Sequence, residues 1–138
     1  MNNPQDGDKA QIISVIDRFY EIISGNSTSE RNWADFTALF SKNASLSTVS
    51  GNGELRTLNV QDYVDVLGGF LKKNDFWERG SCKQITISGH IAYVDSTYEA
   101  SLESDFQTTM QRGTNLIQLA SIDGKWQIVS MLWEDIVD

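Results

Sequence analysis

The stretch from Gln111 to Trp133, QRGTNLIQLASIDGKWQIVSMLW, constrains the fold of this 138-residue chain more than any other. Its two apolar runs flank Asp123-Gly124, a pair that tolerates the positive φ angles of a tight hairpin turn. A hairpin with one solvated face would alternate apolar and polar residues, but both runs are apolar on both faces. The stretch therefore predicts a hairpin covered on one face by helices and on the other by a second copy of the chain.

The length of the turn decides which side chains of this hairpin share a face. A two-residue turn predicts two sets: Leu116, Val129, Met131 and Trp133 on one side, and Ile117, Leu119, Trp126, Ile128 and Leu132 on the other. A bulged three-residue loop would redistribute them, because a slip of one residue moves every side chain to the opposite face. The sequence leaves open whether Trp133 lines a pocket or an interface.

The part of the chain before this hairpin predicts helices first and strands afterwards. Ile12, Ile16, Phe19 and Ile23 recur at helical spacing, which indicates a helix from Asp8 that ends at Gly25. Two shorter amphipathic helices are predicted over 33–40 and 60–71, with strands over 44–49 and 54–58 between them. Residues 76–88, 91–103, 111–122 and 125–136 read as a four-strand antiparallel meander.

This order predicts a single α+β domain over residues 8–138, preceded by a disordered tail over residues 1–7. The net charge of -8 disfavours binding to nucleic acids and to anionic membranes. Neither a signal peptide nor a membrane span is recognisable, so we expect a cytoplasmic protein. With one cysteine, Cys82, and one histidine, His90, we expect no disulfide, no metal site and no cofactor.

Four segments together resemble the nuclear transport factor 2-like superfamily, which includes ketosteroid isomerase and polyketide cyclase-like proteins. They are VIDRFYEIISGNS, DFTALFSKNASLSTV, GHIAYVDSTYEA and LASIDGKWQIVSMLW, and RGTNLIQL with the following hairpin is similar to bacterial members without an assigned function. The resemblance implies a cystatin-like cone, in which a curved antiparallel β-sheet wraps around three N-terminal helices and leaves a pocket open at one end. It also implies a homodimer formed through the outer face of the sheet.

The resemblance does not extend to the residues of ketosteroid isomerase. Phe19 stands where the isomerase has a tyrosine, with Tyr20 one residue beyond, and one residue turns a helical side chain by about 100°. The position of the catalytic base falls near Thr48, and that of the protonated acid falls at Gln118, which cannot exchange a proton. Isomerase chemistry of this kind is therefore disfavoured.

Dehydratase-like and epoxide hydrolase-like members would need histidines or an Asp-Arg-Asp arrangement, whereas His90 is predicted in a turn. The remaining acids are Glu99, Glu103 and Asp105 near one strand end and Glu134-Asp135 near the C-terminus. Glu99 or Glu134 could act as the catalytic acid of an enzyme, and Glu134 or Asp135 could close the pocket mouth. Arg79 and Arg112 at strand ends are candidates for holding an anion, although surface positions are the simpler interpretation.

Aromatic residues with polar tips indicate a ligand pocket. The predicted lining is Tyr20, Trp33, Tyr63, Trp77, Ser96, Tyr98, Gln118 and Trp133. Core packing is an equally simple interpretation of each residue taken alone. The leading hypothesis is a domain that binds a small apolar or aromatic ligand without assigned catalysis. The alternatives are an isomerase, cyclase or dehydratase acting on a ring-containing substrate, and a dimeric protein-interaction module.

Overall fold

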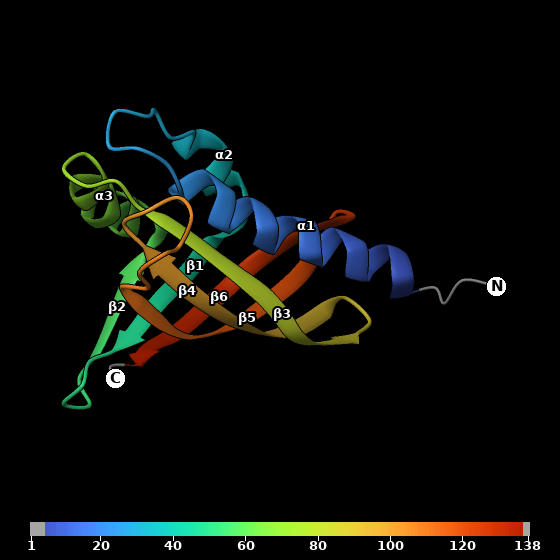
Figure 1. The fold of residues 1–138 in the computed structure, drawn as a ribbon. Coiled ribbons are helices and arrows are strands. Elements are labelled where there is room, and N and C mark those ends of the chain that lie inside the picture. Colours follow the sequence, from blue (N-terminus) through green and yellow to red (C-terminus); the bar gives the residue numbers. More distant parts are fainter. Residues whose placement is uncertain (1–4, 137–138) are drawn as a thin grey trace.

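A computed structural model describes residues 5–136 of the chain. The elements in chain order are α1 (Gln5–Ile23), α2 (Trp33–Ala38), β1 (Phe40–Val49), β2 (Leu55–Asn59), α3 (Val60–Leu71), β3 (Trp77–Ser88), β4 (Ile91–Ser101), β5 (Gln111–Ile122) and β6 (Lys125–Ile136). The helices lie on one side of a curved sheet, with α1 running across it and α3 near the end formed by β1 and β2 (Figure 1). The predicted α+β cone is confirmed.

The sheet has the strand order β2-β1-β6-β5-β4-β3. Strands β3 to β6 form the predicted antiparallel meander, and β1 and β2 pair as an antiparallel hairpin. The two halves join where β1 runs parallel to β6, a pairing the sequence did not predict. This junction brings Thr48 of β1 opposite Trp133 of β6, and so places the first strand of the chain beside the last.

The helices begin where the sequence supplies groups for their free backbone amides. The side chains of Asn32 and Asn59 accept from the amides of Asp35 and Asp62, at 3.0 and 2.8 Å, and so cap α2 and α3. Helix α1 starts earlier than predicted, because residues 5–7 form its first turn and belong to no tail. Acidic residues in that turn, including Asp8, suit the positive end of the helix dipole. Residues 1–4 of the predicted tail lie outside the described residues.

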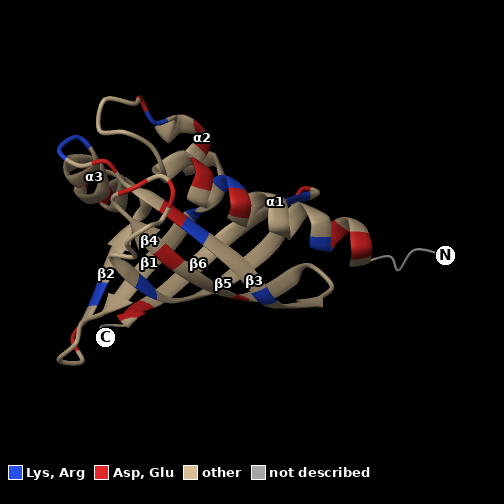
Figure 2. Cartoon of the chain, viewed as in Figure 1, with Lys and Arg blue, Asp and Glu red and all other residues tan. Residues whose placement is uncertain are grey.

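The core fills the space between the helices and the concave face of the sheet. Its largest fully buried side chains include Trp126, Phe36, Ile12, Ile117, Leu119 and Ile128. The indole Nε1 of Trp126 donates to Asp8 at 3.0 Å, which fixes the start of α1 over the start of β6. Charged residues of β5 and β6 lie near the ends of these strands, so the middle of these two strands is uncharged (Figure 2).

The final hairpin turns through two residues, Asp123 and Gly124, with φ angles of 52° and 78°. The predicted face sets are nevertheless wrong, because a bulge interrupts the pairing. Gln118 lies opposite Ser130 while Leu119 lies opposite Ile128, and Val129 is the extra residue. Beyond the bulge Met131 turns inward and Leu132 outward, the reverse of the predicted arrangement. Trp133 consequently lies on the inner face.

Candidate functional site

A cavity of about 420 Å³ lies between α3 and the concave face of the sheet. Six aromatic side chains line it, together with two methionines and several polar residues. The lining is Phe19, Thr48, Arg56, Leu58, Tyr63, Val66, Leu67, Phe70, Phe76, Glu78, Tyr98, Met110, Gln111, Asn115, Met131, Trp133 and Asp135. Exposed residues such as Arg56, Val66 and Met110 form the mouth, whereas Phe19 and Met131 are buried at the floor.

A buried hydrogen-bond network supports this floor. The hydroxyl groups of Tyr20 and Ser96 share a hydrogen bond of 2.8 Å, and the amide nitrogen of Asn115 donates to Tyr20 at 2.9 Å. Burial raises the pKa of Tyr20 to about 12, so the phenol is neutral at physiological pH. Gly80 makes room for the ring, because a Cβ atom there would lie 2.6 Å from Tyr20. The network holds Asn115 at the cavity wall.

A second polar group reaches the cavity through Tyr98. Its hydroxyl donates to Oδ1 of Asp135, and the side-chain amide of Gln111 donates to Oδ2 at 3.3 Å. Burial, followed by the hydrogen bond to Asp135, raises the pKa of Tyr98 well above its ordinary value. Both carboxylate oxygens of Asp135 are therefore occupied by protein donors.

Glu78, the second residue of β3, also lines the cavity. Across residues 5–136, its carboxylate has neither a hydrogen-bond partner nor an ion-pair partner. Burial, followed by the negative charge of Asp135, raises its pKa from 4.5 to about 8. Glu78 and Asp135 are thus two acids in one cavity with different surroundings, and environments that separate two pKa values are typical of functional sites.

Five of the eight predicted pocket residues lie at or directly behind this cavity. Tyr63, Tyr98 and Trp133 line it, and the rings of Tyr63 and Trp133 meet edge to face with centroids 5.8 Å apart. Burial raises the pKa of Tyr63 above its ordinary value. Tyr20 and Ser96 form the supporting network behind the wall.

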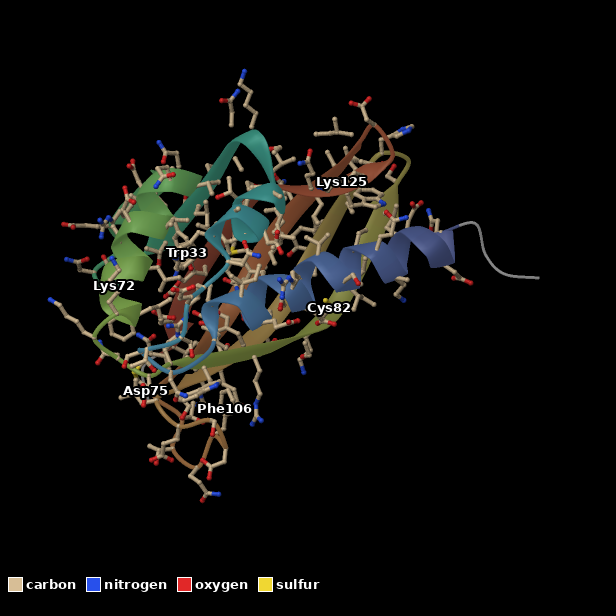
Figure 3. The ribbon with its side chains drawn as sticks, turned by 90° about the horizontal axis from the view of Figure 1, so that it is seen from above. Trp33, Lys72, Asp75, Cys82, Phe106 and Lys125 are labelled. Carbon is tan, nitrogen blue, oxygen red and sulfur yellow. The ribbon has the colours of Figure 1, made fainter. Side chains whose placement is uncertain are left out.

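The other three predicted residues lie elsewhere, and strand parity explains two of them. Trp77 precedes Glu78 on β3, so successive side chains point to opposite faces and the cavity receives Glu78. Gln118 lies on the outer face of β5, where it accepts from the hydroxyl of Ser130 at 2.9 Å. Trp33 packs beside Phe36 and over Gly68, between α2 and α3 and away from the cavity lining (Figure 3).

Glu78 and Asn115 are not among the residues predicted from the sequence, because that prediction was based on aromatic side chains. The alternation of side chains along a strand could have identified them. Asn115 shares its face with Ile117 of the same strand, and Glu78 shares its face with Gly80, the glycine beneath Tyr20. Of the two acids predicted as candidates to close the mouth, Asp135 lines the cavity and Glu134 does not.

The remaining candidate residues lie outside the cavity lining. Glu99 pairs with Arg79, whose guanidinium stacks on Phe106 of the β4–β5 loop at 4.0 Å. His90 is exposed in its turn. Burial raises the pKa of the Cys82 thiol, which disfavours the nucleophilic thiolate. Within the described part of the chain, no group of three or more His, Cys, Asp or Glu side chains could hold a metal ion, and no helix is long and apolar enough to cross a membrane.

Residues 11–134, nearly the whole chain, match the model of a protein family described as "Putative lumazine-binding". The chain belongs to this family. Its fold is nuclear transport factor 2-like, as the resemblance implied. A comparison with curated proteins finds no match.

Solved structures share the fold at low sequence identity. A nuclear transport factor 2-like protein of unknown function from Shewanella baltica is 18% identical, with a TM-score of 0.71 over 99% of this chain and 100% of that one. A Nostoc punctiforme protein of unknown function with a cystatin-like fold is 15% identical, with a TM-score of 0.75 over 95% and 92%. A Novosphingobium aromaticivorans protein described as a "Putative Scytalone Dehydratase" is also 15% identical, with a TM-score of 0.73 over 95% and 85%. These similarities establish the fold alone.

Proposed function

We propose that the protein binds a small, flat, largely apolar ring-containing molecule in the cavity between α3 and the sheet. The observation that carries this proposal is the cavity itself. Its volume of about 420 Å³ lies in the range of small-molecule sites, and its aromatic walls surround a few polar groups. Tyr63 and Trp133 present two rings at right angles, so a flat ligand could stack on one ring and meet the edge of the other.

The family description makes lumazine, a bicyclic ring with N–H donors and carbonyl acceptors, the natural first probe. Calorimetric titrations with lumazine and with naphthalene alcohols would test ring binding directly. Val66 lies at the mouth and is 50% exposed, so Val66→Trp should narrow the cavity and weaken binding at least tenfold with little loss of stability. Ile91→Trp, at a residue that is 63% exposed and outside the cavity lining, is the matched control.

Two outcomes would contradict this proposal. If no ring compound bound at millimolar concentration, the cavity would have no such function. If ring compounds bound equally well to the parent protein and to Val66→Trp, the binding site would lie elsewhere on the molecule.

One observation also favours an enzyme that transfers protons on a ring-containing substrate. A carboxyl group whose pKa lies at about 8 can donate its proton to a leaving oxygen and later accept one, and Glu78 faces the cavity. For this second candidate, Glu78→Gln should abolish turnover while a ring product still binds. If ring compounds bound but none was ever turned over, the enzyme proposal would fall and ligand binding alone would remain.

We also propose that the outer face of the sheet pairs with a second copy of the chain. Apolar side chains stand exposed on that face, each between 36% and 41% accessible: Tyr93, Leu116, Val129 and Leu132. Leu116 and Leu132 lie directly opposite each other on β5 and β6, at the centre of the sheet. Burial of such a patch against its own copy would remove this apolar surface from water.

A further inference from the structure

The feature that the binding proposal does not explain is the unpartnered carboxylate of Glu78, a half-buried residue that lines the cavity. An acid partly shielded from water is commonly paired with a cation or held by hydrogen-bond donors. Asp135 has two donors, Tyr98 and Gln111, whereas Glu78 has none among the residues that the structure describes. The cavity therefore contains an acidic group for which residues 5–136 supply no donor, so a ligand can supply one.

Among residues 5–136, the side chains whose electrostatic interaction with Glu78 is resolved carry no positive charge. Tyr20 from α1, Tyr63 from α3, Tyr98 from β4 and Asp135 from β6 interact with it electrostatically, and three of these are neutral phenols. The cationic side chain in the cavity lining is Arg56 of β2, which is exposed at the mouth. The interior is thus acidic and the rim basic.

The aromatic walls of the cavity favour cations, as its acids do. The faces of Trp and Tyr rings carry partial negative charge and attract cations, more strongly where water is excluded. Trp133 and Tyr63 stand in the same cavity as Glu78. A ring without N–H or N⁺ groups would fill the apolar volume but would leave Glu78 without a partner, and a charged donor forms the stronger hydrogen bond to a carboxylate.

From this geometry we infer that the ligand carries a positively charged nitrogen on its ring system, and that this nitrogen pairs with the carboxylate of Glu78. The inference rests on the proposed ring-binding function and adds the charge of the ligand. A cationic ligand supplies the partner that the protein lacks, while its ring occupies the space between α3 and β6. The proton of Glu78 leaves to solvent when the cation binds.

A matched pair of probes separates charge from shape. 1-Naphthylmethylamine is a cation near neutral pH, and 1-naphthylmethanol has nearly the same shape without the charge. At about pH 8 we expect the amine to bind at least tenfold more tightly than the alcohol. Its affinity should rise about tenfold per pH unit between about pH 6 and 8, because Glu78, with a pKa of about 8, must lose a proton.

Calorimetry of the parent protein in phosphate and in Tris buffer measures this proton directly. Near pH 7 the amine should release close to one proton and the alcohol none. Glu78→Gln should abolish both the proton release and the preference for the amine, but the variant should still bind the alcohol. Glu103→Gln, at an exposed acid outside the cavity lining, should behave as the parent does.

The possible failures are distinguishable. If the alcohol bound as tightly as the amine, if the amine caused proton uptake, or if Glu78→Gln kept its preference for the amine, the charge inference would be overturned and ring binding would stand. If neither probe bound, the ring-binding function would fall and the charge inference with it.

Discussion

Two glycines create the space in which the tyrosines of the site lie. A Cβ atom at Gly80 would lie 2.6 Å from the ring of Tyr20, and one at Gly113 would lie 2.5 Å from the hydroxyl of Tyr98. Gly113 also faces backbone, since its Cβ would lie 2.3 Å from the carbonyl oxygen of Glu134. Neither glycine has a positive φ angle, so close packing is what requires a residue without a side chain.

Gly113→Ala should therefore lower the free energy of unfolding by about 1–3 kcal/mol, the usual cost of overpacking. Gly69→Ala is the control, because Gly69 lies in α3 with open space around it and alanine should stabilise the helix by about 0.5–1 kcal/mol. Denaturant titration measures both changes. A Gly113→Ala protein as stable as its parent would contradict the packing described here.

Glu78 should make the stability of the free protein depend on pH. Its pKa is about 8 in the folded state against 4.5 for the free side chain, so between these values the folded chain keeps a proton that the unfolded chain has lost. The contribution of Glu78 to the free energy of unfolding therefore falls as the pH rises through this window. Relative to the parent, Glu78→Gln should melt at a progressively higher temperature between about pH 5 and 8.

Thermal melts of both proteins across this range measure the effect, with Glu103→Gln as the control for an exposed acid. If the melting temperatures of parent and Glu78→Gln changed in parallel with pH, the pKa of Glu78 would not be raised.

At the scale of elements, Arg31 secures the end of α1. Its guanidinium donates to the backbone carbonyls of Gly25 and Asn26, both at 2.9 Å, and reaches Ile23 at 3.5 Å. These carbonyls follow the last turn of the helix, where backbone acceptors lack intrahelical partners. The backbone of Gly25 in turn pairs with Phe76, the residue that leads into β3 and lines the cavity.

Arg31→Ala should cost about 2 kcal/mol of stability, because hydrogen bonds from a charged donor are lost. Arg31→Lys should restore only part of this, since an ammonium group cannot span the same carbonyls as a planar guanidinium. Lys73→Ala, at an exposed site in the loop between α3 and β3, is the control. Chemical denaturation distinguishes the variants, and an unchanged Arg31→Ala protein would be the contrary result.

The pattern of apolar and turn residues was sufficient to predict the helices, the strands and the Asp123-Gly124 turn, since each depends on local residue order. Pairings between distant segments were not predictable in this way. The parallel contact of β1 with β6 joins residues more than 80 positions apart. The bulge at Val129 has no turn residue to mark it, and it alone decides that Met131 and Trp133 face inward. In β3, the aromatic Trp77 was predicted in place of its neighbour Glu78, whose position in the cavity wall depends on helices from elsewhere in the chain.

At the scale of the whole molecule, the curved sheet has two different surfaces. The concave surface holds the helices and the cavity, and the outer surface exposes apolar side chains at its centre. We predict that Leu132→Glu converts a dimer into a monomer, because a charge would be placed in the centre of a self-complementary apolar patch. Light scattering at high micromolar concentration measures the mass, with Leu55→Glu on edge strand β2 as the control. A monomeric parent protein would exclude the dimer.

The cavity is the place where we propose that a ring-containing molecule binds, and the four tryptophans offer the most direct test. Trp133 lines the cavity, whereas Trp33, Trp77 and Trp126 do not. Fluorine NMR of protein labelled with 5-fluorotryptophan, assigned through Trp133→Phe, would follow all four residues during titration with 1-naphthylmethylamine. We predict that the Trp133 resonance shifts most, with smaller changes at the other three. A titration in which the amine bound while Trp133 stayed unchanged, or the absence of binding by both the amine and 1-naphthylmethanol, would contradict the proposed site.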